Sequence, residues 1–95
     1  MEKLVYNGKY RHFKGMEYRV IKEIEIQDEA LVLYQKLYDD YSYWLRPIDM
    51  FLGYKDGVKR FSYIENFIGK QELSNEAEAR HSETGKVYMI SLVGL

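Results

Sequence analysis

The densest group of chemically capable side chains lies near the start of this 95-residue chain, where residues 10–15 read YRHFKG. Basic and aromatic residues alternate there, a pattern typical of strands that stack nucleic-acid bases and contact phosphates. Arg11 and Lys14, with Lys59 and Arg60 further along, are therefore candidate nucleic-acid contacts. The alternative interpretation is that one ring of this segment packs in a core while its charges face water.

A second candidate surface is centred on Trp44 and Arg46, which share one face of a predicted strand. Tryptophan and arginine are enriched among the residues that dominate binding energy, and a guanidinium also stacks on an indole ring. Together with Tyr10 and His12 they form the candidate ligand-binding surface for a protein or peptide. The competing interpretation makes Trp44 the main ring of the core.

Signatures of catalysis and of metal binding are missing from the sequence. The two histidines, His12 and His81, lie far apart and have no metal-ligand spacing. Residues 81–83 read HSE, but neighbours in sequence cannot form a triad, whose geometry is tertiary. No phosphate-binding loop, dinucleotide fingerprint or nucleophile elbow is present. We therefore expect no enzyme activity, no catalytic residue, no metal and no cofactor.

Composition narrows the class of protein further. The chain is 46% hydrophobic and 31% charged, carries a formal net charge of -1, and has no cysteine. This excludes disulfides, cysteine-bound metals and thiol catalysis. No apolar run approaches the length of a membrane helix, and residues 1–6 are too polar for a signal peptide. We expect a cytoplasmic protein with no membrane contact, and the near-zero charge argues against bulk nucleic-acid binding.

The first two-thirds of the chain alternates with period two, which predicts strands. The alternation in residues 17–27 reverses once at Ile21, which predicts a β-bulge. Residues 30–38 are apolar on both parities, so this strand should be covered on both faces. Pro47 should end the next strand and begin a helical turn, and the Asp-Gly pair at 56–57 predicts a hairpin.

The last third differs in character. Residues 74–80 favour a short helix, because Asn75 and Glu78 fit a capping box. Residues 86–93 then read as an apolar strand that must pair with something. We expect residues 65–95 to be a C-terminal extension of a helical turn and one strand. That strand either packs on the preceding domain or exchanges between two copies, giving a monomer or a strand-swapped dimer.

Three motifs in order resemble a known family. Residues 8–18 read GKYRHFKGMEY, residues 33–38 read LYQKLY, and residues 44–51 read WLRPIDMF. The sequence from about 8 to 64 is similar to the small bacterial Domain of Unknown Function 1653 family. The resemblance implies an SH3-like β-roll and carries over no activity and no site, since the family has no assigned function.

One departure from the family pattern bears on the extension. The family usually has an A-R-H-[ST]-E-T turn between the strands of its first and second motifs, but residues 24–30 of this chain read IEIQDEA. The phrase occurs instead at residues 79–84, ARHSET, followed by a strand-like segment. The extension therefore resembles a displaced copy of the family's second hairpin. Either it is the remnant of a second domain, or it completes the fold.

These observations define the expected protein. Residues 8–64 form a mainly β domain, a small SH3-like antiparallel barrel or roll, and residues 65–95 extend it. The expected function is a non-catalytic binding or interaction module in a small, uncharacterised bacterial protein, with a protein or peptide as partner. The alternative is a small nucleic-acid-binding β-barrel.

Overall fold

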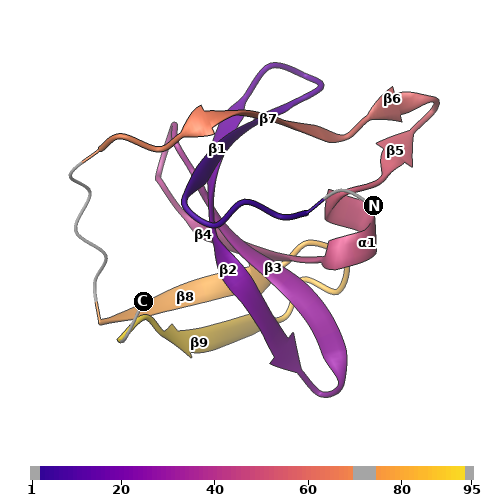
Figure 1. Cartoon of the computed structure of the whole chain (residues 1–95). Coiled ribbons are helices and arrows are strands. Elements are labelled where there is room, and N and C mark those ends of the chain that lie inside the picture. The colour runs from indigo at the N-terminus through magenta and orange to yellow at the C-terminus, as the bar shows by residue number, and fades with distance from the viewer. Residues whose placement is uncertain (1–2, 70–74, 94–95) are drawn as a thin grey trace.

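The computed structural model describes residues 3–69 and 75–93, and their fold is mainly β, as predicted (Figure 1). Seven strands form one sheet in the order β7-β1-β2-β3-β4-β8-β9, and β5 pairs with β6 in a separate hairpin. The strands are β1 (Gly8–His12), β2 (Glu17–Ile26), β3 (Glu29–Lys36), β4 (Tyr43–Pro47), β5 (Tyr54–Lys55), β6 (Val58–Lys59), β7 (Phe61–Asn66), β8 (Glu76–His81) and β9 (Val87–Ser91). A single helical turn, α1 (Ile48–Phe51), follows Pro47.

The sheet is open, so of the two expected forms, barrel or roll, the barrel is wrong. Its neighbouring strands are antiparallel, except that β8 pairs with β4 in parallel. Because β8 occupies the edge of β4, that edge is not available to close the sheet onto β7. The sheet therefore ends in two edge strands, β7 and β9. Strand β7 also runs two residues beyond position 64, the predicted domain boundary.

Local sequence signals at the turns and the bulge are confirmed. Asp56 and Gly57 both have positive φ, 52° and 79°, as a two-residue hairpin turn requires. The turn between β2 and β3 is of the same kind, with φ of 51° at Gln27 and 65° at Asp28. The pairing of β2 with β3 shifts register between Val20 and Lys22, where the alternation of the sequence reverses.

Strand β3 is buried on both faces, as its double-sided apolar sequence predicts, and it separates two cores. The first core lies on the side of α1 and contains Tyr10, Tyr18, Val20, Val32, Tyr34, Phe51 and Phe61. The second lies against the β8–β9 hairpin and contains Ile21, Leu31, Leu33, Leu45, Ala77, Ala79 and Leu92. Figure 1 shows that hairpin in the lower part of the view, with α1 and the β5–β6 hairpin at the upper right. The C-terminal extension thus covers one face of the sheet.

The predicted helix at residues 74–80 is wrong within the described part, because residues 76–81 form strand β8. Alternate side chains of β8 are buried, and the small Ala77 and Ala79 pack against the second core. Alanine and glutamate are good helix formers, but intrinsic propensity is readily overridden by tertiary context, and pairing with β4 and β9 outweighs it here. The predicted strand that follows is confirmed as β9. It pairs with β8 of the same chain, and residue 74 lies outside the described residues.

Within the described residues, no helix is long and apolar enough to cross a membrane.

Candidate functional site

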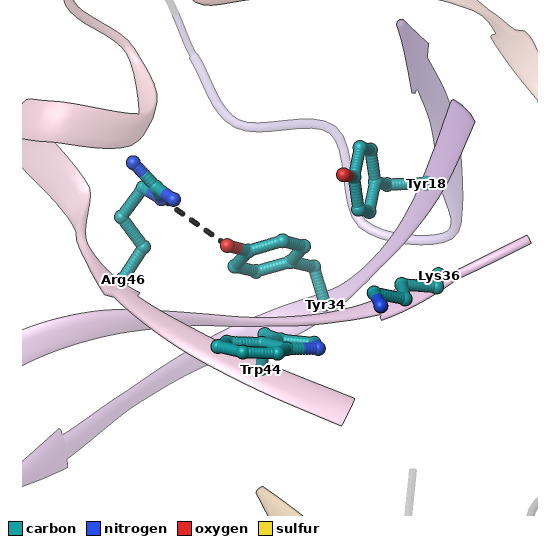
Figure 2. A pocket seen from close by; sticks show the side chains of 5 residues that line it. All are labelled: Tyr18, Tyr34, Lys36, Trp44 and Arg46. Carbon is teal, nitrogen blue, oxygen red and sulfur yellow. Dashed lines mark hydrogen bonds between the residues drawn. The ribbon is translucent and has the colours of Figure 1, made fainter. Parts of the chain in front are cut away.

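Five side chains from β2, β3 and β4 line a small cavity of about 140 Å³ on the first-core side of the sheet. They are Tyr18, Tyr34, Lys36, Trp44 and Arg46, and we call this cavity the aromatic–cation pocket (Figure 2). The pocket exists because cross-strand pairing sets Tyr34 beside Trp44 and Tyr18 beside Lys36. Sequence reasoning singled out Trp44 and Arg46, but it did not find the two tyrosines or the lysine.

Arg46 lies at one end of the pocket, where Figure 2 shows its guanidinium directed at the tip of Tyr34. Its Nε donates a hydrogen bond of 3.1 Å to the Tyr34 hydroxyl, and its guanidinium carbon lies 5.6 Å from the Phe61 ring centroid. Burial raises the pKa of Tyr34, and the Arg46 charge opposes that rise. Tyr34 is therefore neutral at physiological pH, and it does not offset the positive charge that the guanidinium offers to an anion.

Lys36 lies at the other end of the pocket, beside aromatic rings. Its Nζ is 5.7 Å from the Trp44 ring centroid and 5.3 Å from that of Tyr38. Tyr38 in turn shares a 2.7 Å hydrogen bond with the Tyr18 hydroxyl, and burial followed by this bond raises the pKa of Tyr18. Lys36 Nζ also forms a long ion pair with Asp40 Oδ1, at 3.9 Å. The pocket thus has two cationic ends and aromatic walls.

Trp44 combines the two roles that the sequence left open. Its ring is half-buried and packs against the first core, so it contributes to stability. Its Nε1 donates to the Ser42 hydroxyl at 2.9 Å, which fixes the plane of the indole. The same ring forms a wall of the aromatic–cation pocket. A side chain held in this way presents a preformed surface for a ligand.

Tyr10 and His12, the other two members of the predicted ligand surface, are not among the residues that line this pocket. Tyr10 is fully buried in the first core, and its hydroxyl accepts the backbone N–H of Val5 at 3.0 Å, so Tyr10 cannot present a ligand surface. His12 ends β1, and its Nδ1 accepts the Lys14 backbone N–H at 3.1 Å. Burial, followed by the charge of Arg46, lowers the pKa of His12.

A second concavity, which we call the β1–β7 groove, lies next to His12 and has a volume of about 570 Å³. Two of the four predicted nucleic-acid contacts line it, Arg11 and Lys59, whereas Lys14 and Arg60 do not. Arg11 is already paired with Glu17 at 2.7 Å. Phe13 and Tyr63, both about two-fifths exposed, also line the groove. Tyr63 was not predicted, because only the pairing of β7 with β1 brings it there.

His81 is a structural residue of the turn between β8 and β9. It is 4% exposed, its Nε2 lies 2.8 Å from Glu29 Oε1, and its Nδ1 accepts the backbone N–H groups of Glu83 and Thr84. Because Nδ1 accepts, the proton of the neutral ring is on Nε2 and is donated to Glu29. Through Glu29, the first residue of β3, the turn thereby connects the extension to that strand. Across residues 3–69 and 75–93, no group of three metal-ligating side chains is close enough to hold a metal ion.

Comparison with known proteins identifies the family. A family model described as "Protein of unknown function (DUF1653)" matches residues 8–63, more than half of the chain. No curated protein and no solved structure matches the chain. The match covers β1 to most of β7, including the Trp44 and Arg46 segment, and stops before β8 and β9. The chain therefore belongs to the DUF1653 family.

Proposed function

We propose that the protein is a non-catalytic binding module that holds an acidic side chain of a protein or peptide in the aromatic–cation pocket. One observation carries this proposal: Arg46 and Lys36 stand at the two ends of a cavity whose lining contains no carboxylate. A carboxylate that enters would accept hydrogen bonds from the guanidinium fork, and it would gain from two positive charges. The aromatic walls would pack against the methylene groups of the same side chain.

The size of the pocket favours a single side chain as its occupant. Its volume is about 140 Å³, and cavities of about 150 Å³ hold one benzene ring. A nucleobase with its sugar and phosphate is larger than this, whereas an aspartate or glutamate side chain fits. Weak, reversible affinity is expected, because one side chain buries little surface.

The single tryptophan of the chain makes a direct test available. A short peptide rich in aspartate is titrated against the protein while Trp44 fluorescence and the indole N–H resonance are followed. The matched peptide with asparagine in place of each aspartate is the control. We expect saturable changes with the acidic peptide alone, and their loss in Arg46→Gln. Equal response to both peptides, or an unchanged response in Arg46→Gln, refutes the proposal.

The β1–β7 groove supports a second candidate function, the binding of single-stranded nucleic acid. The specific observation is that the exposed rings of Phe13 and Tyr63 line the same groove as Arg11 and Lys59. Such sites usually combine aromatic rings, which stack on the bases, with cationic side chains, which contact the phosphates. The pairing of Arg11 with Glu17 reduces the charge offered there, which is why this function is second.

The salt dependence of binding and variants at each site distinguish the two functions. Binding of an oligothymidylate in the groove should weaken steeply as salt rises, and Lys59→Ala and Phe13→Ala should reduce it while Arg46→Gln leaves it nearly unchanged. Binding of the acidic peptide should be lost in Arg46→Gln and should stay nearly unchanged in Lys59→Ala and Phe13→Ala. If the protein has no affinity for the oligonucleotide at low salt, the second function is excluded.

We infer that residues 8–64 are an SH3-like roll, supported by the antiparallel order of β7 to β4 and by the helical turn α1 before β5. We also infer a bacterial, cytoplasmic protein. The lack of cysteine, and so of disulfides, supports a reducing compartment, and secretion of the protein into the medium would overturn that inference.

A further inference from the structure

Strand β9 is an edge strand of the sheet, and it carries no charged residue. Among the residues that the structure describes, the sheet order ends at β9, which pairs with β8 on one side only. Its sequence, VYMIS, has no charge in a chain that is 31% charged. Edge strands of monomeric proteins usually carry lysine, proline, an inward charge or a bulge that prevents further pairing. The opposite edge strand, β7, contains Glu65, which binds Lys9 at 3.3 Å.

Two of the three outward side chains of β9 are apolar and exposed, and the third is Ser91. Val87 is 45% exposed and Met89 is 60% exposed, and Val93, just beyond the strand, is 71% exposed. The inward side chains Tyr88 and Ile90 are only half-buried, although both pack against the second core. The second core is therefore incompletely covered at this edge. A further strand beside β9 would extend the core and cover both sets of side chains.

We propose that β9 pairs with β9 of a second copy of this chain, in antiparallel orientation around Met89, to form a homodimer. A strand without charge is complementary to itself, since no like charges face each other when it pairs with its own copy. With Met89 opposite Met89, Tyr88 lies beside Ile90 of the partner subunit, and the second cores of both copies become continuous. Such an interface has two-fold symmetry and closes without further growth.

The dimer is weak, because the contact is one short strand wide. Interfaces of this size belong to the low-area class of protein complexes. Strand β9 has five residues, and only part of its backbone gains new hydrogen bonds. We therefore expect dissociation on dilution.

The test is the concentration dependence of the mass. Sedimentation equilibrium of the full chain between about 10 µM and about 1 mM should show the mass rise from 11.4 kDa toward twice that value. Met89→Lys should abolish the rise, because two lysines then face each other, and Met89→Glu should do the same. Mixing these two variants in equal amounts should restore a species of dimer mass. The restoration requires the two positions to lie opposite each other.

Controls separate this pairing from general adhesion. Val58→Lys replaces an apolar residue of similar exposure, 50%, in the β5–β6 hairpin and should leave dimerisation unchanged. Unaltered amide spectra of Met89→Lys outside β8 and β9 show that the variant is folded. A mass of 11.4 kDa at every concentration overturns the proposal. A dimer that persists in Met89→Lys, or that Val58→Lys abolishes as well, also overturns it.

Discussion

Removal of the Arg46 side chain should destabilise the protein even when no ligand is present. Arg46 Nε donates to the hydroxyl of Tyr34, a residue only 2% exposed. A hydrogen bond to a charged group contributes about 1.5–3 kcal/mol, and a stranded buried hydroxyl costs about 1–3 kcal/mol. We therefore expect Arg46→Ala to lower the free energy of unfolding by about 2.5 kcal/mol. In a chain of this length that lowers Tm by about 10–15 °C.

Substitution of Tyr34 tests whether this loss comes from the Arg46–Tyr34 hydrogen bond. Tyr34→Phe removes the hydroxyl, and the Arg46 Nε–H that loses its acceptor belongs to a half-buried side chain that can reach water, so the substitution should cost only about 1 kcal/mol. In that background Arg46→Ala loses only its contact with the Phe61 ring, which is worth about 0.5–1 kcal/mol. The double variant should therefore be destabilised by about 2 kcal/mol, clearly less than the sum of the two single effects.

Urea unfolding followed by Trp44 fluorescence measures all three variants. Lys36→Ala is the matched control, because its ion pair with the exposed Asp40 is long, at 3.9 Å, and its loss should change stability little. Additive effects of Arg46→Ala and Tyr34→Phe would refute the coupling. A destabilisation in Arg46→Ala no larger than that of the control would show that Arg46 has no structural role.

Three further predictions follow from the fold. The pKa of His12 is lowered by burial and then by the charge of Arg46, so its neutral form stabilises the fold above about pH 6.5. That stability is lost as the pH falls below this value toward the lowered pKa. Thermal unfolding should therefore show Tm falling with pH in this range, and the fall should be smaller in His12→Gln. Ala79 is fully buried in the second core, so Ala79→Asp should cost more than about 3 kcal/mol in urea unfolding, whereas Glu78→Gln on the exposed face should change little. Gly57 has a φ of 79°, so Gly57→Ala should lower the free energy of unfolding by about 1 kcal/mol, and an unchanged value would contradict the turn geometry.

The elements that local patterning specifies are those that the sequence predicts well. The bulge near Ile21, the Asp-Gly hairpin and the doubly buried β3 each follow from parity or from turn chemistry over a few residues. Strand β8 fails by the same reasoning. Its residues alternate in burial, but alanine and glutamate also suit a helix, and only the distant partner β4 decides between the two. Pairing between segments about 35 residues apart leaves no local signal.

The candidate site shows the same division. Trp44 and Arg46 are two positions apart on one strand, so their shared face can be read from the sequence. Tyr34 and Lys36 join them through the register of β3 with β4, and Tyr18 joins through the register of β2 with β3. Tyr10 failed as a surface residue because tyrosine is equally suited to a core when its hydroxyl has a partner, here the Val5 backbone.

The two histidines illustrate how residues with catalytic potential serve as turn anchors in this fold. In each case Nδ1 accepts the backbone N–H two residues later, and the histidine carbonyl accepts the N–H of a glycine with positive φ, Gly15 or Gly85. A ring held in this way has only Nε2 left for other contacts. For His81 that nitrogen is occupied by Glu29. His12 instead has the charge of Arg46 as its strongest electrostatic neighbour, and it lines the β1–β7 groove. Of the two histidines, His12 is therefore the one placed to contact a ligand in the β1–β7 groove, whereas the Nε2 of His81 is taken up by Glu29.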